Sequence, residues 1–276
     1  MRRQYLCLQP LSLEEEEKQK SLTRDHSRHE SMNNRGRSWI DAIEFERLHP
    51  NRWLDDEIVN AFVSLLNKRN MRFRCRGAPT KQNRTSSQQD AKPIVPKHNS
   101  LFQSTRPRVH MFNSFFLHRR FLATYNYERV RRWRKKACGD VPVSGNDLFL
   151  FPFHEKMHWT LAAIDMRGRQ FLYLDSRGGK ERHGIFSALG RWLKDEIAEW
   201  EPGARLEFED VNAWKRVTNP AWMPRQTDEV SCGLFMLYNA YFLELGKEPS
   251  FSENDMDVLR GRTALFFDRG ALPERG

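Results

Sequence analysis

The feature that most constrains the fold is a succession of three apolar segments between residues 147 and 176. They are DLFLFPF (147–153), HWTLAAID (158–165) and QFLYLDS (170–176), and only short connections separate them. Apolar runs of this length, bounded by turn residues, are typical of buried strands. We therefore predict that the three segments are adjacent strands of one sheet, and that the last two form a hairpin.

Helical patterns precede and follow this sheet in the chain. Three helices are predicted from apolar spacing, over 55–70, 185–200 and 232–246. We also expect a basic helix over 127–136 and one more strand over 206–212. Helices around a central sheet, without regular βαβ repetition, predict an α+β fold.

Two segments lack the pattern of a folded domain. Residues 1–37 combine the acidic run EEEEKQK with a polar mixture, and residues 74–108 hold four prolines among polar residues. Such segments cannot bury enough apolar surface to fold, so we predict a disordered N-terminal tail and a disordered insertion. The remaining chain, 38–276 around the insertion, has a length that suits one domain.

The formal net charge of +10 raises the question of nucleic-acid binding. Most of the excess lies in residues 74–108, where eight Lys or Arg residues stand against one acid. The rest of the predicted domain is close to neutral. This distribution argues against nucleic acid as the main partner, except through the insertion.

The sequence also bears on cellular compartment. No apolar run approaches the ~20 residues of a membrane span, and the first residues lack the apolar core of a secretory signal. The four cysteines, Cys7, Cys75, Cys138 and Cys232, lie far apart without a Cys-x-x-Cys pair. This spacing argues against a zinc site and a disulfide framework and favours a reducing compartment. We expect a soluble protein with no membrane partner.

Cys232 stands at the start of the apolar segment 232–246, directly before Gly233. The free N–H groups and the positive end of a helix stabilise a thiolate, so this cysteine is a candidate nucleophile. The small Gly233 would let a substrate carbonyl approach the backbone. A buried structural cysteine is the alternative.

The predicted hairpin offers a base and a residue to orient it. If its turn centres on Arg167–Gly168, Asp175 faces Thr160 and shares a sheet face with His158. The diagonal from His158 to Asp175 is then ~7–8 Å between backbones, which an imidazole and a carboxylate can bridge. Such a pair can activate a nucleophile. His154 is a rival base, and a structural histidine is the other alternative.

Three further candidates lie in other segments. Gln226, six residues before Cys232, could donate a hydrogen bond to an oxyanion together with the Cys232 backbone N–H. Taken singly, Gln226 is more typical of a surface glutamine, and Trp53 and Trp159 are more typical of core tryptophans.

Several motifs occur in the same order as in one protease family. They are RWLDDEIVN (52–60), HMFNSFF (110–116), VRRWRKK (130–136) with the strand segments above, and MPRQTDEVSCGLF (223–235). In turn they resemble that family's WLNDE motif, its NTFF-like strand, its long central block and its PQQxNGxDCGxF nucleophile segment. On these motifs the chain resembles the Ulp/SENP family of SUMO-deconjugating cysteine proteases.

The resemblance implies a papain-like α+β fold with the nucleophile at the start of a buried helix. It also implies roles for four residues: Cys232 attacks, His158 is the base, Asp175 orients it and Gln226 lines the oxyanion hole. His158 is preferred to His154 because the family's histidine directly precedes tryptophan, as His158 precedes Trp159.

The resemblance further implies how the modifier is held. Trp53 and Trp159 would form the narrow tunnel that admits a Gly-Gly tail and rejects bulkier residues. Asp56, and with it Arg132 of VRRW, would contact the globular surface of the modifier.

One residue and two segments are compared separately with the family pattern. Ser231 stands where the family usually has Asp, which affects local hydrogen bonding rather than the reaction. The insertion 74–108 precedes the NSFF segment, and we expect a solvated loop there. RRWRKK (131–136) has the composition of a nuclear localisation signal, but its match to a helix of the domain favours a solvated helix face.

The implied function is a thiol protease and isopeptidase that cleaves after the C-terminal Gly-Gly of SUMO, in precursors and in lysine conjugates. The implied partners are SUMO and its conjugates, with no metal or organic cofactor, a monomeric state, and a nuclear or cytoplasmic location. The alternatives are ubiquitin or the cullin-type modifier as substrate, acyl transfer to an acceptor, and a non-catalytic protein that binds a modifier or nucleic acid. Bacterial effectors delivered into host cells can look similar.

Overall fold

The computed structural model describes residues 5–24, 45–77, 101–102, 105–134 and 141–274. Its centre is a mixed five-stranded sheet in the order β1-β2-β3-β4-β5. β1 and β5 run parallel to their neighbours, and the other pairs are antiparallel. The strands are β1 (Val109–Met111), β2 (Leu148–Glu155), β3 (His158–Asp165), β4 (Gln170–Leu174) and β5 (Lys215–Thr218).

The three segments predicted as adjacent strands are β2, β3 and β4, so this prediction is confirmed. In the hairpin, Leu161 lies opposite Leu174 and Asp165 opposite Gln170, which is the register expected for a turn at Arg167–Gly168. β2 is buried on both faces over residues 148–153 because helices cover the sheet on both sides.

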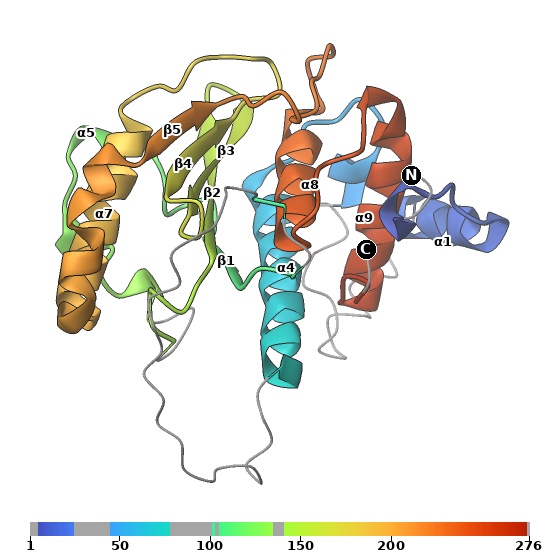
Figure 1. Cartoon of the computed structure of the whole chain (residues 1–276). Coiled ribbons are helices and arrows are strands. Elements are labelled where there is room, and N and C mark those ends of the chain that lie inside the picture. The colour runs from blue at the N-terminus through green and yellow to red at the C-terminus, as the bar shows by residue number, and fades with distance from the viewer. Residues whose placement is uncertain (1–4, 25–44, 78–100, 103–104, 135–140, 275–276) are drawn as a thin grey trace, which may run out of the picture.

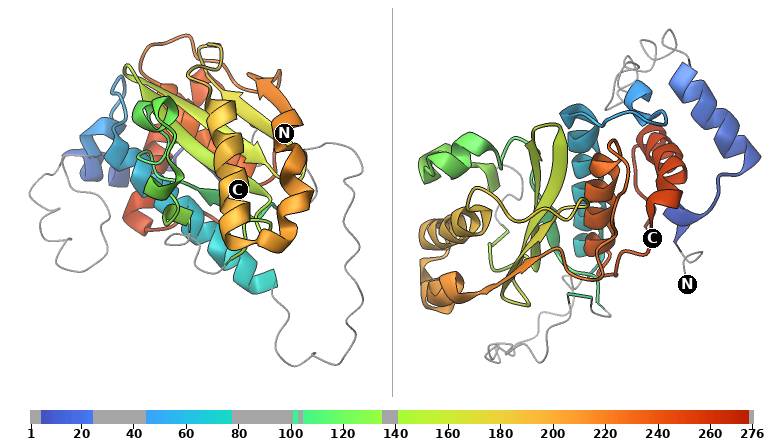
Figure 2. Two further views of the ribbon diagram at one scale, coloured as in Figure 1. Left: turned by 90° about the vertical axis from the view of Figure 1, so that its left-hand side faces the viewer. Right: turned by 90° about the horizontal axis from the view of Figure 1, so that it is seen from above.

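Helices form layers on the two faces of the sheet (Figure 1 and Figure 2). One face carries α5 (Arg119–Ala123), α7 (Ile185–Trp200) and the 3-10 segment η6 (Pro202–Ala213). The other carries α4 (Asp56–Gly77) and α8 (Cys232–Glu244), with α9 (Met256–Arg269) and α1 (Leu13–Arg24) further out. Short 3-10 turns are η2 (Leu6–Leu8), η3 (Glu46–Leu48), η5 (Tyr127–Arg129) and η7 (Glu253–Asp255). This is the α+β fold that the sequence predicts.

The helices predicted over 55–70, 185–200 and 232–246 are present as α4, α7 and α8, and α8 lies at the centre of the protein. Every residue of α8 is buried, as expected of a helix that is apolar on all sides. It packs against β3 and α4, which places its first residue, Cys232, beside the sheet. α4 begins where Asp55 Oδ1 accepts a hydrogen bond from the Ile58 N–H at 3.1 Å. None of the described helices is long and apolar enough to cross a membrane.

The strand predicted over 206–212 is wrong. These residues belong to η6, and the edge strand β5 follows it. Val211 is buried, and Phe208 packs against the same apolar cluster. The two residues are three apart, so they align in a 3-10 helix of three residues per turn, whereas strand alternation would put them on opposite faces.

The prediction of a disordered tail over 1–37 is wrong for residues 5–24. Cys7, at the centre of η2, is fully buried. α1 packs along α9, where Glu15 and Arg262 form an ion pair of 2.6 Å. Apolar periodicity missed this segment because charged side chains supply much of its contact with α9. The rest of the predicted tail lies outside the described residues.

Two other predicted segments are described only in part. The proposed insertion 74–108 begins inside α4, which continues to Gly77, and ends where Arg106 forms an ion pair with the buried Glu244. Residues 78–100 and 103–104 lie outside the described residues, so disorder there stays a prediction. The basic helix expected over 127–136 begins as the 3-10 turn η5, continues through turns at 130–132 and is helical at 133–134, and its last two residues are also outside the description.

Candidate active site

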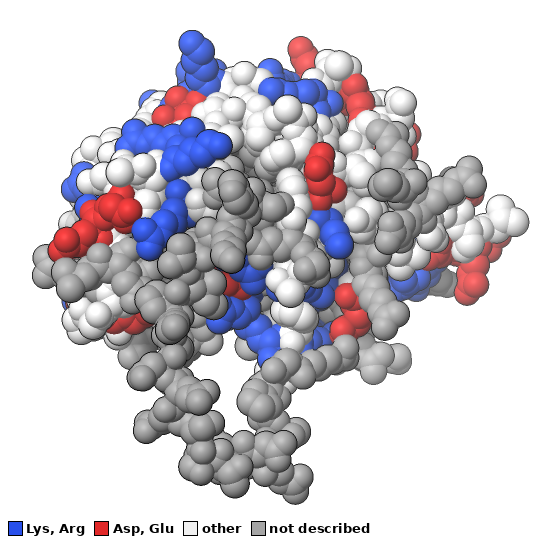
Figure 3. Space-filling view, in the orientation of Figure 1, with Lys and Arg blue, Asp and Glu red and all other residues white. Residues whose placement is uncertain are grey.

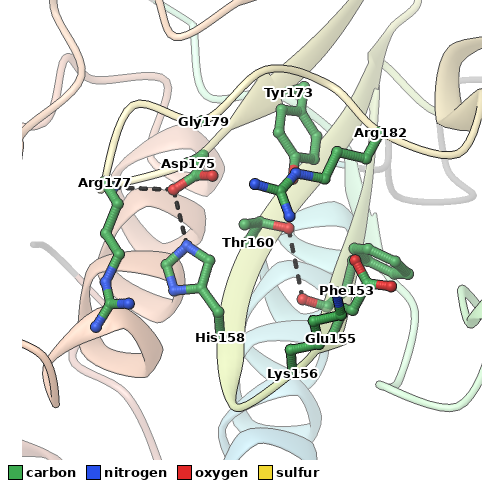
Figure 4. Close-up of a pocket in the computed structure, with 10 residues that line it drawn as sticks. All are labelled: Phe153, Glu155, Lys156, His158, Thr160, Tyr173, Asp175, Arg177, Gly179 and Arg182. Carbon is green, nitrogen blue, oxygen red and sulfur yellow. Dashed lines mark hydrogen bonds and ion pairs between the residues drawn. The ribbon is translucent and has the colours of Figure 1, made fainter.

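The start of β3 and the end of β4 bring two titratable side chains together. His158 Nε2 lies 2.8 Å from Asp175 Oδ1, along the diagonal expected from the hairpin register (Figure 4). Asp175 is buried, and its Oδ1 also accepts a hydrogen bond from the Arg177 backbone N–H at 2.9 Å. The imidazole is therefore held by a carboxylate whose own position is fixed.

Electrostatics favour the charged form of both partners. Burial lowers the pKa of His158, but the hydrogen bonds and charges of Asp175 and Cys232 outweigh this and raise the pKa to about 9. Burial alone would raise the pKa of Asp175. The hydrogen bond and charge of His158, with smaller contributions from neighbouring groups, outweigh burial and hold this pKa below its usual range. At neutral pH the pair is therefore an imidazolium beside a carboxylate.

Cys232 acts on the same imidazole ring through its charge. It is the first residue of α8, it is buried, and its thiol interacts with His158. Because Nε2 is bonded to Asp175, Nδ1 is the nitrogen left to serve Cys232, and it is buried without a hydrogen-bond partner among the described residues. The free N–H groups at the start of α8 stabilise negative charge on the sulfur. The structure thus brings the predicted nucleophile, base and orienting acid into one cluster.

Gln226 is buried beside the loop that precedes Cys232. Its Nε2 donates a hydrogen bond to the backbone oxygen of Asp228 at 2.8 Å, and its Oε1 accepts one from the Ser176 hydroxyl. These bonds fix the side chain next to the nucleophile segment. Its role in an oxyanion hole stays a prediction, because the amide is bonded to the loop in this structure.

The two tryptophans predicted to form a tunnel lie at different depths. Trp159 is 2% exposed, belongs to the core and donates a hydrogen bond to the Leu54 backbone oxygen at 2.9 Å. Trp53 is 42% exposed and donates to the Glu229 backbone oxygen at 2.9 Å. Only Trp53 therefore presents an open indole, and it does so beside the loop that leads to the nucleophile.

His154 makes contacts that differ from those of a base. Its ring stacks on Trp159 with 4.4 Å between centroids. Burial lowers its pKa, although the nearby charge of Asp56 opposes the shift. The structure therefore favours His158 over His154 as the residue that serves Cys232.

Gly233 allows close packing beside the nucleophile, which the sequence did not reveal. A Cβ at this position would come within 3.0 Å of the Leu54 side chain, so the glycine lets α8 approach the segment before α4.

The structure gives the positions of the two residues proposed to contact the modifier. Asp56 lies in the first turn of α4, and Arg132 is exposed after η5 without a hydrogen bond or ion pair to the described site residues. Their contact with a modifier stays a prediction.

Several residues that hold the site carry no motif. The backbone N–H of Asp228 donates to the Glu253 carboxylate at 2.7 Å, and Arg177 Nη2 donates to the Glu229 backbone oxygen at 2.9 Å. Asn219 holds Asp175, and its Asn-Pro dipeptide is a turn signal. A turn signal does not show which other segment the turn will contact.

Among the described residues, no group of three His, Cys, Asp or Glu side chains could hold a metal ion.

Comparison with known proteins identifies a matching family. Residues 95–269 match the Ulp1 protease family, C-terminal catalytic domain. The putative ubiquitin-like-specific protease 1B of Arabidopsis thaliana is 29% identical over 231 residues, which cover 82% of this chain and 56% of that protein. The chain therefore spans little more than half the length of this curated relative.

Solved structures show the same fold. The Chaetomium thermophilum Ulp1-like SUMO protease catalytic domain matches with a TM-score of 0.68 and 21% identity, over 96% of this chain and 92% of that one. The C-terminal Ulp1 protease domain in complex with SMT3, the yeast ortholog of SUMO, matches with a TM-score of 0.65 and 18% identity, over 95% and 97% of the two chains. Because the family match covers more than half of its residues, this chain belongs to the Ulp1 protease family.

Proposed function

We propose that this protein is a cysteine protease and isopeptidase that cleaves after the C-terminal glycine of SUMO or a closely related modifier. The observation that carries the proposal is the cluster of Cys232, His158 and Asp175, with the base bonded to its acid at 2.8 Å. The catalytic unit would be 38–276, and this chemistry requires no metal or organic cofactor.

The first half of the reaction would form a thioester. Cys232 Sγ attacks the carbonyl carbon of the terminal glycine, and the carbonyl oxygen takes the negative charge. The Cys232 N–H and the amide of Gln226 would hold this oxyanion. As it collapses, the C–N bond breaks and the His158 imidazolium gives its proton to the departing lysine amine.

The second half would release the modifier. Neutral His158 takes a proton from water, and the water oxygen attacks the thioester carbon. The C–S bond then breaks, which returns the imidazolium beside the thiolate and frees the modifier as a carboxylic acid that loses its proton to solvent. Asp175 keeps the ring oriented in both halves and stabilises its charged form.

The proposed substrate rests on the family and on the entrance to the site. A structural relative is bound to SMT3, the yeast ortholog of SUMO. The exposed Trp53 and the buried Trp159 would restrict the channel to a Gly-Gly tail, because a larger side chain would meet an indole. Asp56 and Arg132 would contact the globular part of the modifier.

The proposed partners are SUMO and its conjugates, met in the nucleus or cytoplasm by a monomeric enzyme. On the face shown in Figure 3, Lys and Arg side chains are interrupted by Asp and Glu. This mixture gives nucleic acid less support than the modifier as main partner.

The proposal is tested with activity probes. The purified protein is mixed with SUMO, ubiquitin and the cullin-type modifier, each carrying a C-terminal thiol-reactive electrophile. We expect an adduct with SUMO that Cys232→Ala abolishes and that Cys75→Ala, which removes an exposed cysteine, leaves intact. An adduct with another modifier alone would refute the substrate but keep the protease. Failure to label with all three would refute the proposed function.

A further inference from the structure

Asp175 is held by its main chain as well as by its carboxylate. Its backbone N–H donates to Asn219 Oδ1 at 2.7 Å, and its backbone oxygen accepts from Arg225 Nη1 at 3.2 Å. These two bonds are separate from those that its Oδ1 accepts from His158 and the Arg177 N–H. The acid is thus fixed at every polar group of its backbone.

The Asn219 amide spans the loop that carries the acid. While its Oδ1 accepts from Asp175, its Nδ2 donates to the Gly179 backbone oxygen at 2.7 Å. Its own N–H donates to the Tyr173 backbone oxygen at 2.9 Å. One side chain therefore ties both ends of the segment 175–179 to the residue after β5. The parallel pairing of β4 and β5 makes this possible, because both strands end at the same edge of the sheet.

The backbone of Asn219 is suited to this position. Its φ is 48°, in the left-handed region that asparagine adopts more readily than most residues other than glycine. The bend turns the chain away from β5 and leaves the amide beside Asp175. Asn219 can therefore be replaced by glycine without forcing a strained backbone, which separates the effect of its amide from that of its conformation.

The segment 175–179 closes tightly around the carboxylate. A Cβ at Gly179 would lie 2.4 Å from Asp175 Oδ2, and one at Gly178 would lie 2.7 Å from Arg225 Nη1. Arg225 stands where the family motif has its first glutamine, in the PQQ of the nucleophile segment. Because Arg225 Nη1 donates to the Asp175 backbone oxygen, Arg225 links the segment that leads to Cys232 with the loop that carries Asp175.

We propose that Asn219 and Arg225 are positioning residues that fix Asp175 against His158. Neither side chain touches the reacting atoms, so both act through the acid. The inference rests on the proposed roles of His158 and Asp175, and it adds two residues that those roles do not include.

The pH at which His158 loses its proton should therefore depend on the Asn219 and Arg225 side chains. The charged and titratable groups around His158 are Asp175 after β4, Cys232 on α8, His154 and Glu155 on β2 and Lys156 after it, and Tyr173, Arg177 and Arg182 lie near Asp175. Of these, Asp175 and Cys232 stabilise the charged ring. A loosely held Asp175 would stabilise it less, so His158 would lose its proton at a lower pH.

The test compares variants by cleavage of a SUMO C-terminal fluorogenic amide. Asn219→Gly keeps the left-handed backbone and removes the amide. We expect kcat to fall about tenfold to hundredfold with KM within about twofold, since a misplaced group affects the transition state more than binding. Its alkaline limb of activity should move to lower pH. Arg225→Gln restores the family residue and should cost less than Arg225→Ala. Asn51→Gly, also left-handed at a φ of 58°, is the matched control and should behave as wild type.

A second readout does not depend on turnover. The imidazole of His158 is titrated by NMR in wild type and in Asn219→Gly, and we expect a lower midpoint in the variant. An unchanged midpoint together with unchanged kcat in a folded Asn219→Gly protein would overturn the inference. If wild type cleaves no modifier, the proposed function fails, while the NMR midpoint still decides whether Asn219 positions the acid. If Asn219→Gly does not fold, Arg225→Ala and Arg225→Gln supply the same comparison.

Discussion

Ser231 donates its hydroxyl hydrogen bond to Asp228 Oδ2, and its backbone N–H donates to Asp228 Oδ1 at 3.1 Å. In the family motif, position 231 is usually Asp and position 228 is Asn. The motif thus has its carboxylate at position 231, whereas this chain has it at position 228. Although Ser231 departs from the motif, the turn before Cys232 still contains a carboxylate, that of Asp228, which is hydrogen-bonded to the side chain at position 231.

This exchange predicts coupling between the two positions. Ser231→Asp alone would place two carboxylates in contact at a buried site, so we expect the free energy of unfolding to fall by about 1–3 kcal/mol. Ser231→Asp combined with Asp228→Asn should recover most of this loss. Urea denaturation of the two single variants and the double variant measures the coupling energy. Additive effects of the two substitutions would contradict the exchange.

The state of His158 predicts the pH dependence of activity. Its pKa is raised to about 9, so the imidazolium that protonates the leaving amine is lost as the pH rises through that value. We expect kcat/KM to fall above about pH 9. Asp175→Asn removes the charge that stabilises the imidazolium and should move this limb to lower pH. Asp195→Asn, where the removed carboxylate lies on α7 and accepts a hydrogen bond from the Tyr125 hydroxyl, should leave the limb in place. A limb that ignores Asp175 would contradict the assigned pair.

The contact between Gly233 and Leu54 predicts a packing defect. Gly233→Ala puts a methyl group within 3.0 Å of the Leu54 side chain, so we expect a loss of about 1–3 kcal/mol in stability. Activity should fall as well, because Cys232 would shift against His158. Leu54→Ala in the same chain should relieve part of the clash. Gly203→Ala, where a Cβ meets nothing within 4 Å, is the matched control. Equal stability of the two glycine variants would show that Leu54 yields without cost.

Burial predicts different reactivities for two free cysteines. Cys7 is fully buried, and burial is the main cause that raises the pKa of its thiol to about 12. Cys75 is exposed near the end of α4. In native protein at neutral pH, iodoacetamide should therefore label Cys75 and leave Cys7 unmodified until the protein unfolds. Peptide mass spectrometry after timed labelling gives both rates. Rapid labelling of Cys7 would mean that residues 5–24 detach from α9.

Local pattern was sufficient where a segment's own residues decide its structure. Continuous apolar runs identified β2, β3, β4 and α8, and helical spacing of apolar residues identified α7, because each segment is stabilised by burying the apolar side chains that it already has. Alternation along β3 and β4, with the length of their turn, also placed His158 and Asp175 on one face. The chemistry of the site could therefore be located from the sequence, and the family motifs added its assignment to named roles.

Contacts between distant segments decided the rest. No local signal shows that α1 will find charged partners on α9, that the chain after β5 will reach Asp175, or that Trp53 stays exposed while Trp159 enters the core. These outcomes depend on which surfaces the completed sheet and its helices bring together. The sequence by itself determined the strands, the main helices and the reacting side chains, because each follows from local periodicity and residue chemistry. Only the tertiary structure decided how firmly the acid is held and which tryptophan is open, because both depend on residues that are far apart in the chain.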